Sequence, residues 1–233
     1  MNRREYLAGG GALVVTGAAA TYFGLRNMGS MEEYHASVAA ARTLLTLAPG
    51  ISDLIRYATL AANSHNTQPW KFKISDVGIE ILPDMARQIA IVDPDNHHLF
   101  ASLGCAAENL AIASGARGKP GELSFSPAND GAVMFAFGSG SLVEPALFDA
   151  IPKRQSTRGD YDGKAVSSRD LQTLSAASAV PGVDLILITD RPRIDRVRDL
   201  VIAGNHAQIA DAAFVRELKA WLRFSRDASS DGA

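Results

Sequence analysis

The chain has 233 residues, of which 47% are hydrophobic and 21% are charged, a composition typical of a folded protein with a sizeable core. Its 23 basic and 25 acidic residues nearly balance, so we expect no broad basic surface and no nucleic-acid partner. The single cysteine, Cys105, excludes an internal disulfide and a cysteine-based zinc site.

Residues 1–30 differ in composition from the rest of the chain. Arg3 and Arg4 stand near the start, and an uncharged run rich in Gly and Ala follows from Ala8 to Leu25. This order predicts a secretory signal, and the paired arginines resemble a twin-arginine signal. A plain membrane anchor is the alternative, because the run reaches the lower end of spanning length. A signal could be cleaved or could stay as a tether.

A twin-arginine signal would make the Tat translocase a partner of this chain. That route carries folded proteins, often with their cofactor already bound, out of the cytoplasm. We therefore expect the protein in the periplasm or cell envelope, either free or tethered to the membrane. If the signal is not functional, the protein would be cytoplasmic.

The first predicted elements are two helices, a loop and a hairpin. In chain order they are a helix at 31–47, a helix at 51–62, a loop at 63–69 and strands at 70–74 and 78–82. Pro49-Gly50 separates the helices, and Ser52 or Asp53 can cap the second one. The loop is too polar, and too restricted by Pro69, to continue that helix.

The remaining elements alternate between helices and strands. They are a helix at 98–116, strands at 122–126 and 132–137, helices at 145–151 and 168–179, a strand at 183–188 and a helix at 193–224. We interpret Cys105, in the alanine-rich helix, as a small buried apolar side chain. The last helix could break near Gly204-Asn205, and the Gly-Ser run at 138–141 favours an internal boundary. The pattern predicts an α+β or mixed α/β sheet packed by helices.

Three segments together resemble the nitroreductase superfamily. Residues 61–72 are similar to its A-P-S-x-x-N-x-Q-P-W-x-F segment, residues 102–110 to its central helix ending in Asn-Leu, and residues 154–158 to its R-x-S-x-R motif. Ordinary members carry R-x-S-x-R ahead of Q-P-W, whereas here the order is reversed. The reversal resembles the Acg-type FMN-binding subfamily, in which two nitroreductase-like halves are fused as an internal dimer.

The resemblance implies an α+β fold with a mixed or antiparallel sheet packed by helices. After the signal or anchor at 1–30, the first half would be 31–140 and the second 141–233. Family members continue well past the last helix, so this second half would be incomplete. The polar ending at 227–233 is then expected to be frayed. An exposed sheet edge would favour self-association.

The resemblance also implies an FMN site shared by two motifs. Arg154, Ser156 and Arg158 would hold the phosphate, because guanidinium groups form parallel charge-assisted hydrogen bonds with such anions. Asn66 and Gln68 would supply amide donors and acceptors to the polar edge of the flavin ring. The other expected flavin contacts, all in the same loop, are Ser64, His65, Pro69 and Trp70.

Each of these residues also has a purely structural interpretation. Arg154 and Arg158 could form a solvated helix end, and Asn66 and Gln68 could satisfy turn backbone. Trp70 is expected to pack in the core whatever the function.

Two further polar features, His97-His98 and Asn109, are more typical of structural roles than of ligand binding. No metal site is predicted at His97-His98, since adjacent side chains diverge on a helix and no carboxylate stands at ligand spacing. Asn109 is more typical of a helix-packing hydrogen bond, although the resemblance makes it a weak candidate for the site.

Through the resemblance, the sequence predicts an FMN-dependent oxidoreductase of nitroreductase type. Electrons would come from NAD(P)H or another donor and pass to a small electron-poor acceptor, such as a quinone or a nitro compound. No catalytic residue is assigned, because the flavin performs the redox step. Two alternatives stay open: a non-catalytic FMN-binding or storage protein, and a truncated inactive remnant.

Overall fold

The computed structural model describes residues 30–128, 130–138, 140, 143, 145–157, 159–180, 182–223 and 230–232. The predicted signal therefore lies outside the described residues, except for Ser30. The chain forms two compact units: a first unit of Met1–Arg154 with Glu217–Ala233, and a second unit of Gln155–Arg216. The prediction of two nitroreductase-like halves, with a boundary near residue 140, stays a prediction.

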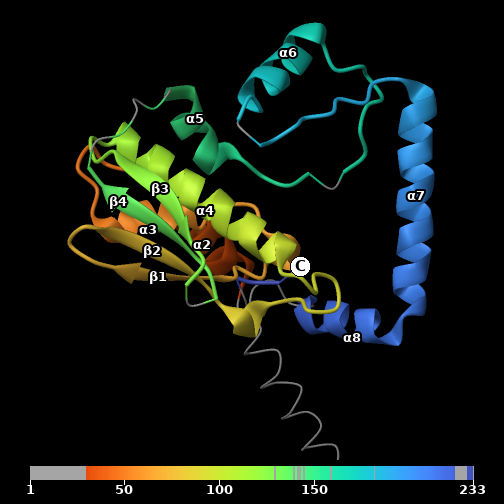
Figure 1. The fold of residues 1–233 in the computed structure, drawn as a ribbon, viewed down its shortest axis with the longest axis horizontal. Helices are drawn as coiled ribbons and strands as arrows, with labels where there is room; N and C mark the ends of the chain where they lie inside the picture. The colour runs from red at the N-terminus through yellow and green to blue at the C-terminus, as the bar shows by residue number, and fades with distance from the viewer. Residues whose placement is uncertain are drawn as a thin grey trace, which may run out of the picture. The chain divides into compact units, whose positions relative to one another are not determined.

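A four-stranded antiparallel sheet forms one layer of the first unit (Figure 1). Its strands are β1 (Trp70–Ile74), β2 (Gly78–Pro83), β3 (Gly121–Ser126) and β4 (Ala132–Phe137), in the order β1-β2-β4-β3. All four predicted strands are present within a residue of their expected ends, and β1 and β2 form the predicted hairpin. The α+β class with an antiparallel sheet packed by helices is confirmed.

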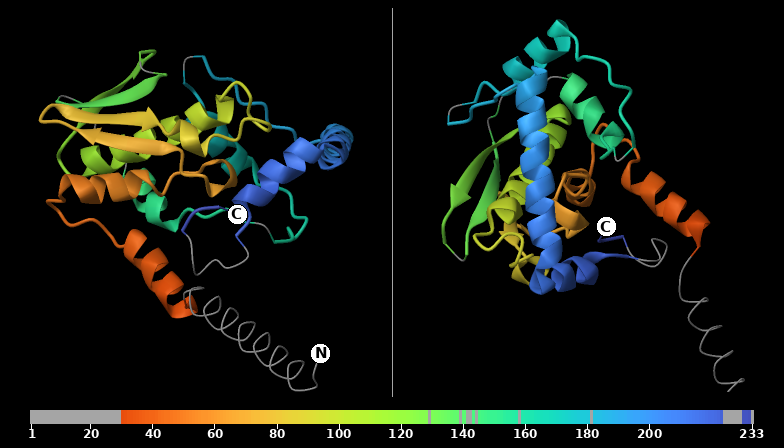
Figure 2. Two further views of the ribbon diagram at one scale, coloured as in Figure 1. Left: turned by 90° about the horizontal axis from the view of Figure 1, so that it is seen from below. Right: turned by 90° about the vertical axis from the view of Figure 1, so that its right-hand side faces the viewer.

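The core of the first unit lies between the sheet and two helices, α3 (Ile51–Ala58) and α4 (His97–Ala116) (Figure 2). Leu103 and Leu110 of α4 are fully buried and belong to the same cluster as the sheet residue Phe135. Helix α4 is long and apolar enough to cross a membrane. Its contacts with β2, β3 and β4 make it the core helix of this unit instead.

The prediction for Cys105 is wrong, because this residue is exposed. It lies on α4, whose buried stripe includes Ser102, Leu103 and Ala106. The helical period thus places Cys105 outside the buried face, which an alanine-rich stretch does not reveal. Asn109 behaves as expected, since its Nδ2 donates to the Tyr57 carbonyl across the helix pair, at 3.3 Å.

A buried carboxylate fixes the start of α4. Asp93 is 2% exposed and accepts hydrogen bonds from the backbone N–H groups of His98 and Leu99, each at 3.0 Å. The Nδ1 of His98 lies 3.1 Å from the same carboxylate. Burial alone would raise the pKa of Asp93, but these hydrogen bonds outweigh it and hold the pKa below its ordinary value.

The first two helices differ in detail from the prediction. Helix α2 (Met31–Ala41) begins at a capping box formed by Ser30 and Glu33, and it ends well before residue 47. Helix α3 is capped by Gly50 rather than by Ser52 or Asp53. Asp53 instead accepts a hydrogen bond from the Gly50 N–H at 3.3 Å, from within the first turn.

The other short elements of the first unit border the loops. They are η1 (Ser64–Asn66), η2 (Met85–Arg87), α5 (Pro145–Ala150) and η3 (Ile151–Lys153). Phe148 of α5 stacks on Tyr57 of α3, with ring centroids 5.5 Å apart, and so anchors this segment to the core.

The second unit contains α6 (Ser168–Ala177), α7 (Arg191–Ala210) and the first half of α8 (Ala212–Trp221). None of its described residues is buried. The prediction of a strand at 183–188 is wrong, since these residues pair with none of the described strands. An unpaired strand is not stable on its own. The predicted helix break lies at Asp211, not at Gly204-Asn205, and the Asp211 carboxylate accepts from the Ala213 N–H at 2.7 Å.

Candidate functional site

The polar loop between α3 and β1 has an unusual backbone. His65, Asn66 and Gln68 have φ angles of 48°, 50° and 51°, in the left-handed region that side chains other than glycine seldom occupy. Such conformations raise the free energy of the chain and persist only where surrounding contacts fix them. Clustered strain of this kind is typical of binding sites, so the loop is a candidate site on geometric grounds alone.

Contacts from both sides hold the loop in this conformation. The Asn63 side chain accepts from the Gln68 N–H at 2.8 Å. Arg87 donates through Nη1 to the Thr67 carbonyl at 2.8 Å, and Thr67 itself is buried. Pro69 and Trp70 are also buried, which ties the end of the loop to the core. The expectation that Trp70 packs in the core is confirmed.

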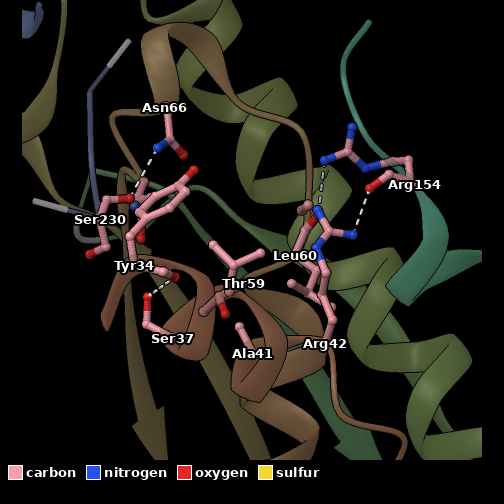
Figure 3. A pocket seen from close by; sticks show the side chains of 12 residues that line it. Tyr34, Ser37, Ala41, Arg42, Thr59, Leu60, Asn66, Arg154 and Ser230 are labelled. Atoms are coloured by element: carbon pink, nitrogen blue, oxygen red, sulfur yellow. Dashed lines mark hydrogen bonds between the residues drawn. The ribbon is translucent and has the colours of Figure 1, made fainter. Parts of the chain in front are cut away.

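The loop contributes two side-chain amides to the wall of one cavity of about 320 Å³. Figure 3 shows the cavity with the Asn66 amide. Asn66 and Gln68 form part of its wall together with residues of α2, the end of α3 and two arginines, Arg42 and Arg154. All of these residues belong to the first unit. We call this space the amide–guanidinium cavity; its lining residues are Tyr34, Ser37, Val38, Ala41, Arg42, Thr59, Leu60, Ala61, Asn66, Gln68, Arg154 and Ser230.

The two guanidinium groups lie on the side of the cavity away from Asn66 (Figure 3). Arg154 donates through Nη2 to the Leu60 carbonyl at 3.1 Å. Arg42 donates through Nη1 to the carbonyls of Pro152, at 2.6 Å, and of Arg154, at 2.9 Å. The other nitrogens of both guanidiniums form no hydrogen bond to another described residue, so they can bind an anion.

Arg42 is the cavity residue that the sequence did not indicate. It is the C-cap of α2, and nothing in its neighbourhood marks it as a ligand. Its bonds to the 152–154 backbone depend on residues more than a hundred positions away. Long-range pairings of this kind leave no local pattern in a single sequence.

The remaining predicted site residues are not gathered in this cavity. Ser64 and His65 are half-buried in η1, and Pro69 and Trp70 are directed into the core, so none of these four lines the cavity. Ser156 is exposed and belongs to the second unit. The predicted phosphate clamp stays a prediction, because its third member lies outside the described residues; that member is Arg158.

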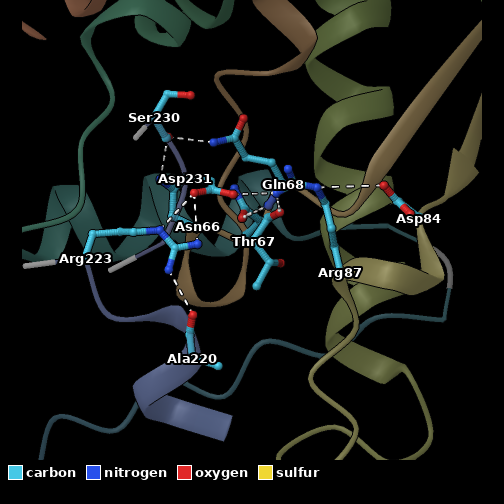
Figure 4. Close-up of polar contacts among 10 residues, drawn as sticks. Asn66, Thr67, Gln68, Asp84, Arg87, Ala220, Arg223, Ser230 and Asp231 are labelled. Atoms are coloured by element: carbon cyan, nitrogen blue, oxygen red, sulfur yellow. Dashed lines mark hydrogen bonds and ion pairs between the residues drawn. The ribbon is translucent and has the colours of Figure 1, made fainter. Parts of the chain in front are cut away.

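A charged cluster lies beside the loop (Figure 4). Asp231 forms ion pairs with Arg87, with Oδ2 and Nη1 2.8 Å apart, and with Arg223, with Oδ1 and Nη2 3.0 Å apart. The Asp84 carboxylate lies 3.8 Å from Arg87 Nε. It also accepts a hydrogen bond from Lys71 Nζ at 2.8 Å. That hydrogen bond, with the nearby positive charges, holds the pKa of Asp84 below its ordinary value.

The described residues contain no group of three or more His, Cys, Asp and Glu side chains that could hold a metal ion. At His97-His98, the second imidazole contacts Asp93 at the start of α4. That contact gives His98 a structural role at the start of α4.

No family model matches the chain. The chain is similar to two proteins from Mycobacterium tuberculosis, one from strain CDC 1551 / Oshkosh and one from strain ATCC 25618 / H37Rv, each named "Putative NAD(P)H nitroreductase". In both cases 28% of residues are identical over 199 residues, which cover 82% of this chain and 54% of the relative. The chain thus spans about half the length of these relatives, and over most of its own length it is similar to proteins named as nitroreductases.

Proposed function

We propose that the first unit binds FMN in the amide–guanidinium cavity, and that the protein is an oxidoreductase of nitroreductase type. The observation that carries the proposal is one cavity lined by the amide residues Asn66 and Gln68 and by two guanidiniums, which lie on the side away from Asn66. The names of the two relatives support the reaction class and suggest NAD(P)H as the electron donor.

The cavity residues fit the chemistry of FMN. Its phosphate is a dianion, which the free nitrogens of Arg42 and Arg154 can bind by charge-assisted hydrogen bonds. Its ring has a polar edge that needs both donors and acceptors, and Asn66 and Gln68 carry both. The volume of about 320 Å³ lies at the lower end of the usual range for small-molecule pockets.

When bound, FMN supplies the transfer of a hydride or an electron pair. The side chains of the cavity bind and orient. Arg42 and Arg154 would fix the phosphate end, while the strained loop presents Asn66 and Gln68 in a set direction. Because Thr67 and Pro69 are buried, the loop has little freedom to turn its amides away. We propose a small electron-poor acceptor, such as a quinone or a nitro compound.

Titration of the full chain with FMN tests the binding step. We expect a yellow complex, and Arg154→Ala should weaken FMN binding roughly ten- to hundredfold, since it removes a charged donor to the phosphate. Arg154→Lys should retain part of the affinity. The matched control is Lys73→Ala, which removes an equal charge from an exposed position on β1 that does not line the cavity. A chain that stays colourless with excess FMN would refute the proposal.

The redox step needs a separate measurement. The yellow complex should be bleached by anaerobic NADPH or NADH and should recover its colour on addition of a quinone. A bound flavin that neither nucleotide reduces would contradict the NAD(P)H-dependent reaction and leave the binding proposal standing.

We also propose export by the twin-arginine route and a fused pseudo-dimer architecture. Arg3-Arg4 and the uncharged run after them support export, and the reversed motif order supports the fusion. Replacing both arginines by lysine should retain a fused reporter in the cytoplasm; unchanged export would refute the first point.

A further inference from the structure

The segment Ser230–Gly232 lies against the amides proposed to bind the flavin ring (Figure 4). The Ser230 carbonyl accepts hydrogen bonds from Asn66 Nδ2 at 3.1 Å and from Gln68 Nε2 at 2.7 Å. The Gly232 N–H donates to the Asn66 carbonyl at 3.0 Å. Instead of the frayed ending expected from the sequence, these three residues contact the distant loop, and Ser230 lies 164 and 162 positions from Asn66 and Gln68.

A second anchor holds the same segment in place. The Asp231 carboxylate bridges two arginines, with Arg87 Nη1 2.8 Å from Oδ2 and Arg223 Nε 3.1 Å from Oδ1. Arg87 also donates to the Thr67 carbonyl, so a single guanidinium joins the segment to the strained loop. Charge-assisted contacts of this kind are stronger than neutral hydrogen bonds.

The position of the Ser230 carbonyl excludes a ligand from the amide pair. An acceptor atom bonded by both Asn66 and Gln68 must lie about 3 Å from each amide nitrogen, which is where the Ser230 oxygen lies. Ser230 is itself part of the cavity wall. Two acceptor atoms cannot share this space, so ligand and segment compete.

We propose that Ser230–Gly232 is an internal competitor that occupies the amide side of the cavity and must leave before a flavin can bind there. The inference rests on the proposed function, since it assigns the occupied amides to FMN. The segment imitates a ligand: its backbone carbonyl fills the place of a ring oxygen, and its carboxylate secures it to two arginines. Apparent affinity then falls in proportion to the fraction of molecules whose segment is released.

Gly232 gives a way to release the segment without touching the cavity. Its φ is +83°, and a Cβ there would lie 2.6 Å from the Trp221 carbonyl oxygen and 2.7 Å from Arg223 Cγ. The backbone oxygen cannot yield as a flexible side chain could, so Gly232→Ala should displace the segment. Asp231→Asn is an independent variant, because it removes the charge that both arginines bind.

We expect Asp231→Asn and Gly232→Ala to tighten FMN binding roughly 5- to 30-fold relative to the parent chain, if the segment is released in only about 3–20% of parent molecules. Hydrogen exchange at residue 232 gives a readout that needs no flavin activity. It should speed up in both variants, and also in the parent chain when FMN is added. The matched control is Asp76→Asn, which removes the same charge as Asp231→Asn from an exposed position between β1 and β2 that does not line the cavity, so affinity and exchange should match the parent.

The outcomes separate this inference from the proposed function. Equal FMN affinity in the parent and both releasing variants, with faster exchange at residue 232, would refute the competition and leave the flavin site intact. Slow exchange in both variants would refute the anchoring by Asp231 and Gly232. Failure of every variant to bind FMN would refute the proposed function itself, and the competition with it.

Discussion

Helices α4 and α7 each contain 20 residues, one in each unit of the chain. Eight residues of α4 are buried, whereas α7 has none. Apolar side chains are present in both, but Leu110 of α4 is fully buried while Leu200 of α7 is 73% exposed.

The two helices show that local contacts are enough to form a helix, whereas burying its side chains requires other elements to pack against. Among the described residues, the hydrogen bonds and ion pairs of helix α7 are local: Asp190 caps it, and Arg191 pairs with Asp195 one turn later. Helix α4 has a sheet and α3 to pack against, and most helical stability in proteins comes from such packing. Four measurements test this difference between the two helices.

The largest difference is expected in hydrogen exchange. Amides in the middle of α4, such as that of Leu110, should open only with the whole unit, whereas those of α7, such as that of Leu200, should open locally. We expect exchange in α4 to be at least roughly a thousandfold slower than in α7 at the same pH. Equal protection of the two helices would mean that α7 has a packing partner in solution, and would contradict the difference described between them.

Two matched leucine substitutions measure the same contrast as stability. Leu110→Ala should destabilise the first unit by about 3–5 kcal/mol, because it leaves a cavity in a closed core. Leu200→Ala should change stability by less than about 0.5 kcal/mol. Urea unfolding followed by tryptophan fluorescence reports on the first unit, since Trp70 and Trp221 both lie in it. A large loss in the α7 variant would contradict our description of the second unit.

A smaller effect is expected at the start of α4. Asp93→Asn should destabilise the first unit by about 2 kcal/mol, because it weakens the bonds to two helix N–H groups. Folding lowers the pKa of Asp93, so its ionised form stabilises the native state above the unfolded pKa of about 3.9. That contribution is lost as pH falls through the lowered value.

The Asn variant should therefore show a flatter loss of stability in acid than the parent chain. The control is Asp190→Asn at the cap of α7, which should leave unfolding of the first unit unchanged. An unaltered acid profile for Asp93→Asn would refute the assigned role of this carboxylate.

The smallest effect is expected on the surface of α7. Arg191 forms two hydrogen bonds to Asp195, but both side chains are solvated, and exposed pairs of this kind contribute little. Arg191→Ala should leave the thermal midpoint of the first unit unchanged and the helical circular dichroism nearly so. A clear shift of that midpoint would show that α7 does support the first unit.

Much of the first unit could be predicted from local patterns. Alternation and turn residues located all four strands, and the segment predicted as a polar, proline-limited loop contains no α-helix, although α3 ends at Ala58, earlier than expected. The same kind of pattern was misleading at 183–188, where apolar, β-branched residues have no described strand to pair with. A strand forms only when it pairs with another strand, and the local sequence does not show whether such a partner is present.

The candidate site was only partly visible in the sequence. Asn66, Gln68 and Arg154 were expected to act together, and all three line one cavity. Arg42 was missed, because its role depends on contacts to the distant 152–154 backbone. The role of Ser230 was missed for the same reason, although its carbonyl contacts both loop amides.

Periodicity, alternation and turn residues in the sequence are enough to predict the four strands, the existence of the helices of the first unit, and the proline-limited polar loop. Those features depend on neighbours within a few residues, so a single chain reveals them. Three features became visible only in the folded protein: α4 is a core helix, Cys105 is exposed, and Ser230–Gly232 occupies the amide side of the cavity. Each of these depends on burial or on contacts between distant segments, which local propensity does not encode.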